Sequence, residues 1–289
     1  MELVYPGLDD FLKTALDEDI GTGDITTNCC VPPEAYSSGS FIMKEAGVIC
    51  GLGVLKRVFE LLDTNIKVTA TASDGDTVES GAVVAKISGP ARPILTGERL
   101  ALNLLQHMSG VATSTAQAVR QVAATGVKIK DTRKTTPGLR ALDKYAVRCG
   151  GGTNHRFNLA DGVLIKDNHI KAAGGITNAI NLVAGDTDAK KTKHLLRMQP
   201  KMEVEVETET LEQVEEALSA GANIIMLDNM PTEMMKEAVK LVGKRALTEA
   251  SGNMGKQSLQ QVAETGVDFI SIGSLTHSVK ALDISLRFE

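Results

Sequence analysis

The sequence predicts an α/β fold in which a small α+β domain with an antiparallel sheet precedes a closed or nearly closed α/β barrel. Three observations support this prediction. The first part of the chain contains strand-like segments of alternating residues. From Ser114 onward, helical segments that end in glycine are each followed at once by a short apolar strand. Polar residues or glycines then stand where each later strand is expected to stop, as at the active edge of a barrel.

The first third of the chain alternates between helical and strand-like segments. Apolar residues at helical spacing predict helices over residues 8–18, 53–62 and 94–108. Alternating or β-branched residues predict short strands at 41–43 and 66–70, and a turn-rich pair of strands within 73–87. Segment 19–27, with two glycines and small polar residues, is predicted to be a turn or loop. The elements between Ser38 and Ile87 indicate a small α+β domain with an antiparallel sheet and no chemistry of its own.

The remaining chain repeats a helix–glycine–strand pattern. Gly126, Gly221 and Gly266 each suit the left-handed position that ends a helix before a tight turn into a strand. Apart from the strands after Gly221 and Gly266, the predicted strands of this part are 127–129, 163–165, 202–207 and 245–250. A helix is predicted over 232–242. At least six such units follow one another, and alternating strands and helices favour parallel strands in a barrel.

Residues 131–170 concentrate positive charge in an acidic chain. This stretch carries seven Lys/Arg and two His against four Asp, whereas the whole chain has a formal net charge of -5. The charges fall at strand ends and beside glycines, which indicates a local anion site rather than a basic surface. The chain has no Trp and only 3% aromatic residues, so stacking platforms for single-stranded nucleic acid are not expected.

The expected strand ends supply a complete set of groups for a phosphorylated sugar. They carry Arg133, Lys134, Lys166, Glu207, Asp228, Glu249, Ser251, Gly252, Asn253, Gly273 and Ser274. Glycine- and serine-rich turns after the last two strands suit a phosphate monoester, and Glu207 with Asp228 suits Mg²⁺ through water or sugar hydroxyls. With Arg156, the cationic residues would serve a pyrophosphate and an acidic acceptor. Phosphoribosyl pyrophosphate with Mg²⁺ has this layout.

Composition and sequence patterns bear on the cellular compartment of the protein and on its classes of partner. No apolar run reaches the roughly 18 residues that span a membrane. The acidic N-terminus shows no secretory signal. The four cysteines, Cys29, Cys30, Cys50 and Cys149, form no CxxC pair and no zinc spacing. We therefore expect a cytoplasmic protein with reduced thiols, without nucleic-acid or membrane partners.

Several long segments resemble the quinolinate phosphoribosyltransferase family, also called nicotinate-nucleotide pyrophosphorylase (carboxylating). The resemblance is carried by DTRKTTPGLRALDKYAV, GGGTNHRFNLADGVLIKDNH, VEVE, MLDNM, EASGN and ISIGSLTHS, and by EDIGTGDITT and GERLALNLLQHMSGVAT nearer the N-terminus. It implies an N-terminal sandwich over residues 1–112, followed by an open α/β barrel over 113–275, with the tail 276–289 returning to the sandwich. It also implies a decarboxylating pentosyltransferase of NAD biosynthesis that uses Mg²⁺.

The resemblance also assigns roles to residues. It implies catalytic roles for Lys134, Lys166, Glu207 and Asp228, of which the two acids would hold the metal directly or through water. It implies substrate contacts from Arg99, Arg133, Lys134, Thr135, His155, Arg156, Lys166, Glu207, Asp228, Ser251, Gly252, Asn253 and Gly273. Arg99 would act in the site of a partner subunit, so a homodimer with shared sites, or a higher oligomer, is expected. Asn253 departs from members that carry a second glycine there.

Two other hypotheses stay open at this point. A strand-end lysine in a phosphate-binding barrel also suits a Schiff-base aldolase, with Lys166 as the reacting amine. The arginines Arg99, Arg133 and Arg156 would then be unexplained. A divergent paralogue without this activity, like the molybdate-operon proteins that resemble the family, is the other hypothesis. The complete set of arginines, lysines and histidine argues against it.

Overall fold

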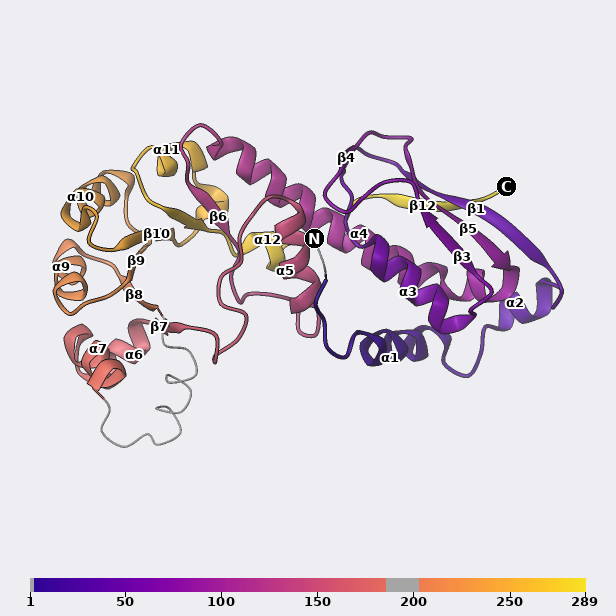
Figure 1. The fold of residues 1–289 in the computed structure, drawn as a ribbon, viewed down its shortest axis with the longest axis horizontal. Coiled ribbons are helices and arrows are strands. Elements are labelled where there is room, and N and C mark those ends of the chain that lie inside the picture. Colours follow the sequence, from indigo (N-terminus) through magenta and orange to yellow (C-terminus); the bar gives the residue numbers. More distant parts are fainter. Residues whose placement is uncertain (1–2, 186–202) are drawn as a thin grey trace. The chain divides into compact units, whose positions relative to one another are not determined.

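The computed structural model describes residues 3–185 and 203–289, which form two compact units (Figure 1). The first unit consists of the residues up to Gln117, of Thr135–Gly152 and of Leu275–Glu289. The second consists of Ala118–Lys134 and the described part of Thr153–Ser274. Helix α4 (Ala91–Val122) runs in sequence from the first unit into the second. Among the described residues, every helix lacks the length or apolar character needed to cross a bilayer.

The first unit is built on an antiparallel sheet that the end of the chain completes. Its strands are β1 (Tyr36–Met43), β3 (Lys67–Ala70), β5 (Val83–Pro90) and β12 (Ile284–Phe288), in the order β12-β1-β5-β3. β12 pairs antiparallel with β1, with Leu286 opposite Phe41. A second small pair joins β2 (Gly47–Val48) to β4 (Thr77–Val78). The C-terminal strand therefore belongs to the sheet of the first unit.

Helices supply the rest of the core of the first unit. They are α1 (Leu8–Ile20), α2 (Ile25–Cys30), α3 (Leu52–Leu62), the first part of α4, and α5 (Arg140–Cys149). Leu12, Phe59, Met108 and Leu142 from four of these helices are fully buried with Phe41 of β1. The apolar faces that predicted the helices at 8–18, 53–62 and 94–108 are the faces that are buried, so these predictions are confirmed.

The loop predicted over 19–27 is only partly present. Residues 25–27 already belong to α2, because Asp24 caps that helix: its side chain accepts a hydrogen bond from the backbone N–H of Thr27 at 2.9 Å. The hydroxyl of Thr96 on α4 donates to the same carboxylate at 3.1 Å. An N-cap aspartate satisfies a backbone donor that the helix leaves open. The prediction was therefore wrong for Asp19 and Ile20, which still belong to α1, and for Ile25–Thr27, where capping outweighs the low helix propensity of threonine.

The second unit is a six-stranded parallel sheet. Its strands are β6 (Lys128–Lys130), β7 (Val163–Ile165), β8 (Val204–Thr208), β9 (Ile224–Asp228), β10 (Leu247–Ser251) and β11 (Phe269–Ser271). Their order is β6-β11-β10-β9-β8-β7, so β6 and β7 are the two edges of the described sheet. Strands from β7 to β11 are neighbours in sequence order, as in a barrel that stays open between β6 and β7. The predicted open α/β barrel is confirmed in this form; Met202, the expected start of one strand, lies outside the described residues.

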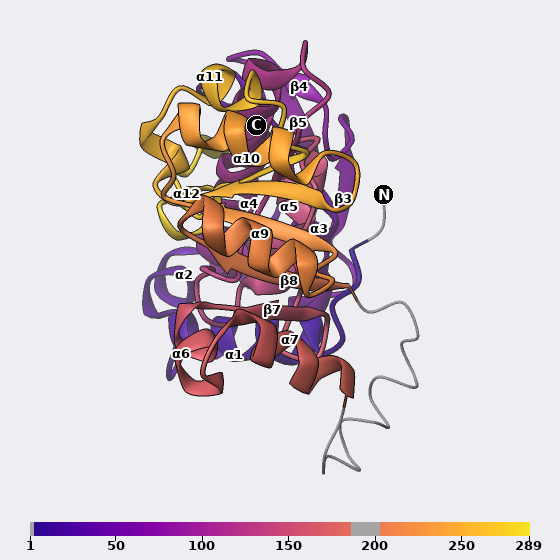
Figure 2. The same ribbon diagram turned by 90° about the vertical axis from the view of Figure 1, so that its left-hand side faces the viewer.

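Helices cover one face of this sheet (Figures 1 and 2). They are α6 (Asp167–Ala173), α7 (Ile176–Gly185), α9 (Leu211–Ser219), α10 (Thr232–Val242) and α11 (Leu259–Ala263), with a short 3-10 turn at Met254–Lys256. The helix predicted over 232–242 is confirmed. Gly126, Gly221 and Gly266 have φ angles of 79°, 93° and 90°, so each takes the left-handed conformation predicted for the turn into a strand.

The packing of the C-terminal tail against α4 leads to a stability prediction. A Cβ on Gly110 would collide with the backbone oxygen of Lys280, while Leu282 donates to the backbone oxygen of Gln106 at 3.1 Å. Because backbone cannot give way like a flexible side chain, Gly110→Ala should lower the free energy of unfolding by about 1–3 kcal/mol. Chemical denaturation measures this.

Gly53→Ala is the matched control. Gly53 is exposed near the start of α3, and a Cβ there meets open space. That variant should be as stable as the parent or more stable by up to about 1 kcal/mol, since alanine favours helix. Equal stability of the two variants would show that the tail does not lie against Gly110.

Candidate active site

The predicted site residues of the second unit gather at one edge of its sheet, because the six strands are parallel. Asp228 at the end of β9 lies opposite Ser251 of β10, and Glu207 of β8 lies opposite Met226, two residues before Asp228. The predicted residues at or just beyond strand ends are Arg133 and Lys134 (β6), Lys166 (β7), Glu207 (β8), Asp228 (β9), Ser251, Gly252 and Asn253 (β10), and Gly273 (β11).

Two predicted residues belong to the first unit instead. Arg99 is exposed on α4, next to the buried Leu100. The hydroxyl of Thr135 accepts a hydrogen bond from Nε of Arg140 at 3.1 Å. The first unit therefore positions the side chains of both residues.

Lysine and carboxylate groups pair at the ends of β7 and β8. Nζ of Lys166 lies 3.0 Å from Oε2 of Glu207. The backbone N–H of Lys166 donates to Nδ1 of His169 at 2.9 Å, which fixes the turn from β7 into α6. On β9, a carboxylate oxygen of Asp228 accepts a hydrogen bond from the side-chain amide of Asn229 at 2.7 Å. At this sheet edge the ammonium of Lys166 is therefore paired with the carboxylate of Glu207.

The turns after β9 and β10 are locked together. Asn229 and Asn253 both have left-handed backbones, with φ of 54° and 53°, and the amide of Asn253 donates to Oδ1 of Asn229 at 3.2 Å. The backbone N–H of Asn229 donates to the oxygen of Ser251 at 2.9 Å. A Cβ on Gly252 would lie 2.7 Å from the backbone nitrogen of Asn229, and φ of Gly252 is 89°. Only glycine fits between these turns.

Arg133 and Arg156 are partly buried and close enough for the charge of one to act on the other. Arg156 donates from Nη1 to the backbone oxygen of Gly162 at 3.1 Å. In residues 3–185 and 203–289, the Nε atoms of Arg133 and Arg156 are buried without a hydrogen-bond partner. Burial lowers the pKa of Arg156 from its ordinary value, and the charge of Arg133 lowers it further. Two neighbouring cations with buried open donors are arranged for an anion.

The loop that carries Arg156 is fixed by its neighbours His155 and Asp131. Fully buried Asp131 accepts the backbone N–H of His155 at 2.7 Å and the side-chain amide of Asn154 at 2.8 Å. The backbone N–H of Arg156 donates to Nδ1 of His155 at 2.8 Å. A neutral His155 therefore carries its proton on Nε2, which lies 2.9 Å from Oε2 of Glu205. His155 thus ties this loop to β8.

Sequence reasoning missed the buried charges below the sheet edge. Nζ of Lys130 donates to Oε2 of Glu249 at 2.7 Å and lies 3.7 Å from the ring centroid of Phe269. Burial raises the pKa of Glu249, and nearby Glu205 raises it further. The sequence predicts Glu249 only as a polar residue at a strand end, and it gives Lys130 no role. These residues could have been found from the sequence as charged residues within short strands of a parallel sheet. Both faces of such a strand are usually buried and apolar, so a charge there is unusual.

Known proteins resemble this chain over both units. The family model for the N-terminal domain of quinolinate phosphoribosyl transferase matches residues 24–109, and the model for its C-terminal domain matches residues 111–287. A probable nicotinate-nucleotide pyrophosphorylase [carboxylating] of Bacillus subtilis is 47% identical over 93% of this chain and 89% of that protein. A chloroplastic nicotinate-nucleotide pyrophosphorylase [carboxylating] of Arabidopsis thaliana is 46% identical over 96% of this chain and 82% of that protein.

Solved structures give the same result. The nicotinate-nucleotide pyrophosphorylase of Francisella tularensis superimposes with a TM-score of 0.89 at 38% identity, covering 99% of this chain and 98% of that one. The corresponding enzyme of Ehrlichia chaffeensis superimposes with a TM-score of 0.88 at 39% identity over the full length of both chains. Both family domains and nearly the whole chain are matched, so this chain belongs to the quinolinate phosphoribosyltransferase family.

Proposed function

We propose that this chain transfers the phosphoribosyl group of phosphoribosyl pyrophosphate to quinolinate and releases pyrophosphate and CO₂. The observation that carries the proposal is the pair Arg133 and Arg156, whose buried Nε donors lack hydrogen-bond partners among the described residues. Leaving a buried donor open costs about 1–3 kcal/mol, so a ligand that closes it is favoured. The family relationship gives the ligand its identity.

The arginine pair favours a dicarboxylate over a monocarboxylate. Quinolinate has carboxylates on neighbouring ring carbons, so each planar guanidinium can meet one carboxylate with two hydrogen bonds. Nicotinate has one carboxylate and would leave one arginine open and the like charges of the pair unscreened. His155 has Nδ1 and Nε2 directed to Arg156 and Glu205, so its proposed role is to position Arg156.

The phosphoribosyl donor fits the rest of the sheet edge. Lys134 and Lys166 would neutralise the pyrophosphate, and Glu207 with Asp228 would meet the ribose hydroxyls. The locked turns that carry Ser251, Gly252 and Asn253, together with Gly273, would receive the 5′-phosphate. Asn253 donates its amide to Asn229, so its contribution there would be a backbone N–H rather than a side chain.

Glu207 and Asp228 also fit the Mg²⁺ that the family implies. Both are carboxylates at neighbouring strand ends, and Mg²⁺ prefers one or two carboxylates completed by water and substrate phosphate. When bound, the ion would neutralise charge on the pyrophosphate. The protein residues beside it would orient the ribose so that its C1′ faces the pyridine ring.

The chemistry needs positioning more than a protein nucleophile. The pyridine nitrogen forms a bond to C1′ as the bond from C1′ to pyrophosphate breaks, and pyrophosphate leaves with that electron pair. The ring nitrogen is then positive, so the bond to the 2-carboxylate can break with its electrons stabilised by the ring. CO₂ leaves, C2 takes a proton from water, and nicotinate mononucleotide remains. Fixed geometry and lysine charge at the leaving group supply the acceleration.

The aldolase hypothesis does not fit the contacts of Lys166. A Schiff base forms from a neutral amine, and such lysines are typically buried in apolar surroundings or placed beside another cation. Here Nζ lies 3.0 Å from a carboxylate oxygen of Glu207 and the side chain is 47% exposed, so its surroundings are polar and solvated. The comparisons likewise give no support to a non-catalytic paralogue, since the named relatives are pyrophosphorylases.

A homodimer with shared active sites belongs to the same proposal. Arg99 is exposed on α4 of the first unit, where a cation beside buried apolar neighbours suits a contact outside its own chain. Its proposed role is to reach the quinolinate carboxylates in the partner subunit's site. A cytoplasmic location also stays a prediction, and the Arabidopsis relative is named as chloroplastic.

The proposed reaction is tested by pyrophosphate release from phosphoribosyl pyrophosphate and Mg²⁺, with quinolinate, nicotinate or no acid. We expect release with quinolinate, accompanied by an equal amount of CO₂, and little release in the other two reactions. The two acids are also offered together in competition. A preference for nicotinate, or release without any acid, would contradict the assignment.

Shared sites are tested by mixing two inactive variants, Arg99→Ala and Lys166→Ala, under conditions of subunit exchange. In a mixed dimer, two-fold symmetry gives one site both defects and the other site neither, so activity should return to at most about half per heterodimer. As a control, each variant is taken alone through the same exchange procedure and should stay inactive. If exchange is demonstrated and no activity returns, Arg99 acts within its own chain.

A further inference from the structure

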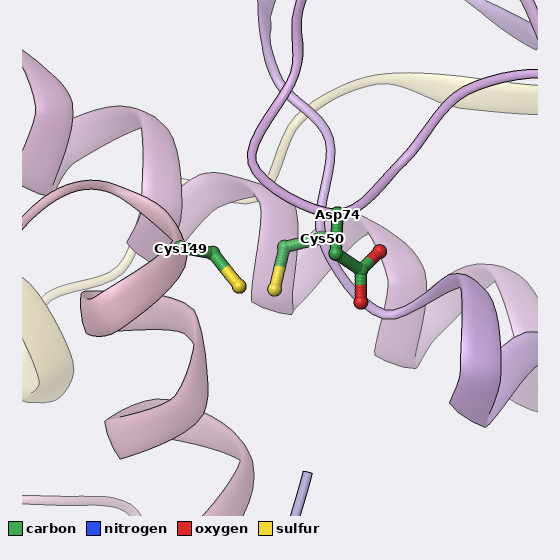
Figure 3. Close-up of side chains that lie close together, drawn as sticks. All are labelled: Cys50, Asp74 and Cys149. Atoms are coloured by element: carbon green, nitrogen blue, oxygen red, sulfur yellow. The ribbon is translucent and has the colours of Figure 1, made fainter. Parts of the chain in front are cut away.

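We propose that Cys50, Asp74 and Cys149 of the first unit form a binding site for a thiophilic divalent cation such as Zn²⁺. The site is separate from the sheet-edge residues and does not depend on the proposed reaction. Figure 3 shows the sulfur atoms of Cys50 and Cys149 facing each other, with Asp74 beside Cys50. One ligand atom from each residue lies within 4.8 Å of the other two.

The distances suit tetrahedral coordination. With Zn–S of about 2.3 Å and Zn–O of about 2.1 Å, tetrahedral angles separate two sulfurs by about 3.8 Å and a sulfur from an oxygen by about 3.6 Å. The three donor atoms lie within 4.8 Å of one another, so each pair would have to approach by no more than roughly 1.2 Å to reach these separations. Two sulfurs select a soft cation over Mg²⁺, which prefers oxygen donors. The fourth position would be taken by water.

The surroundings hold the carboxylate in place. Oδ1 of Asp74 accepts the backbone N–H groups of Gly51 and Leu52 at 2.9 and 3.0 Å, and Oδ2 accepts the hydroxyl of Tyr145 at 2.8 Å. The backbone N–H of Cys50 donates to Oγ of Ser109 at 3.0 Å. Hydrogen bonds of this kind orient metal ligands in proteins, and here they exist within the chain.

The two thiols differ in a way that suits stepwise binding. Cys149 is partly exposed, and its hydrogen bond with Cys50 lowers its pKa below the ordinary value. Cys50 is fully buried, and burial raises the pKa of its thiol. Because Cys149 is partly exposed and Cys50 is fully buried, a cation would reach Cys149 before Cys50. The bound cation would link the segment after β2, the turn at Asp74 and the end of α5.

The test uses the full-length chain with the two exposed thiols removed, Cys29→Ser/Cys30→Ser, after reduction and treatment with chelator. These cysteines lie on α2 and would otherwise contribute background binding. Titration with Co²⁺ should produce a thiolate-to-cobalt charge-transfer absorption that saturates at one Co²⁺ per chain. Zn²⁺ should abolish it, Mg²⁺ should not, and Cys149→Ser in this background should lose it.

Protection of Cys149 from alkylation is a second readout, and it needs no variant at the site. Zn²⁺ should slow alkylation of Cys149 by iodoacetamide at least tenfold, as followed by mass spectrometry, and should raise the melting temperature. Asp74→Asn should still bind Co²⁺, but at least tenfold more weakly. No charge-transfer band, a band that survives in Cys149→Ser, or unchanged alkylation would overturn the proposal. So would conversion of the pair to a disulfide by peroxide in a chain that binds no Zn²⁺, which would assign a redox role instead.

Discussion

The second unit depends on a buried group of charges that must balance one another. Glu249 is fully buried, and its carboxylate receives the ammonium of Lys130 at 2.7 Å and lies 3.7 Å from Nε2 of His155. Glu205 lies 2.9 Å from the same histidine nitrogen. Removing one partner from such a group leaves an uncompensated charge, at a cost of about 3–5 kcal/mol. β6, β8 and β10 and the loop at His155 are thereby held in one arrangement.

This arrangement determines where the proposed site residues stand. Side chains two residues apart on a strand point to the same face, so Glu207 follows Glu205 on β8, and Ser251 follows Glu249 on β10. The buried carboxylates therefore set the direction of the groups at the sheet edge above them. His155 does the same for Arg156 through the hydrogen bond to the backbone of Arg156. The proposed anion site is consequently held in place by contacts within the chain, which is what catalysis by positioning requires.

Local patterns in the sequence were sufficient for much of this fold. Glycine in the left-handed position can be recognised because the conformation needs it, and Gly126, Gly221 and Gly266 marked the starts of three strands. Charged residues at strand ends marked the site, since the ends of parallel strands meet at one edge. The roles of individual site residues came from family resemblance and not from spacing.

Contacts between distant segments could not be predicted in the same way. Lys130 and Glu249 are 119 residues apart, and nothing in either strand specifies the other as its partner. Cys50 and Cys149 belong to separate elements of the first unit, so their spacing in the sequence resembled no metal motif. Prediction from local sequence also failed at Asp24. Its carboxylate caps α2 by accepting the backbone N–H of Thr27, and it also accepts the hydroxyl of Thr96, which is 72 residues away in the sequence.

The proposed activity depends on Arg133 meeting a substrate carboxylate through its planar guanidinium. The most direct measurement is kcat/KM for quinolinate in Arg133→Lys, which keeps the charge and removes the paired hydrogen bonds. We expect a loss of about 2–4 kcal/mol, or about 30- to 1000-fold, whereas Arg120→Lys at an exposed position of α4 should match the parent. An Arg133→Lys variant within threefold of the parent would show that Arg133 does not bind the substrate directly.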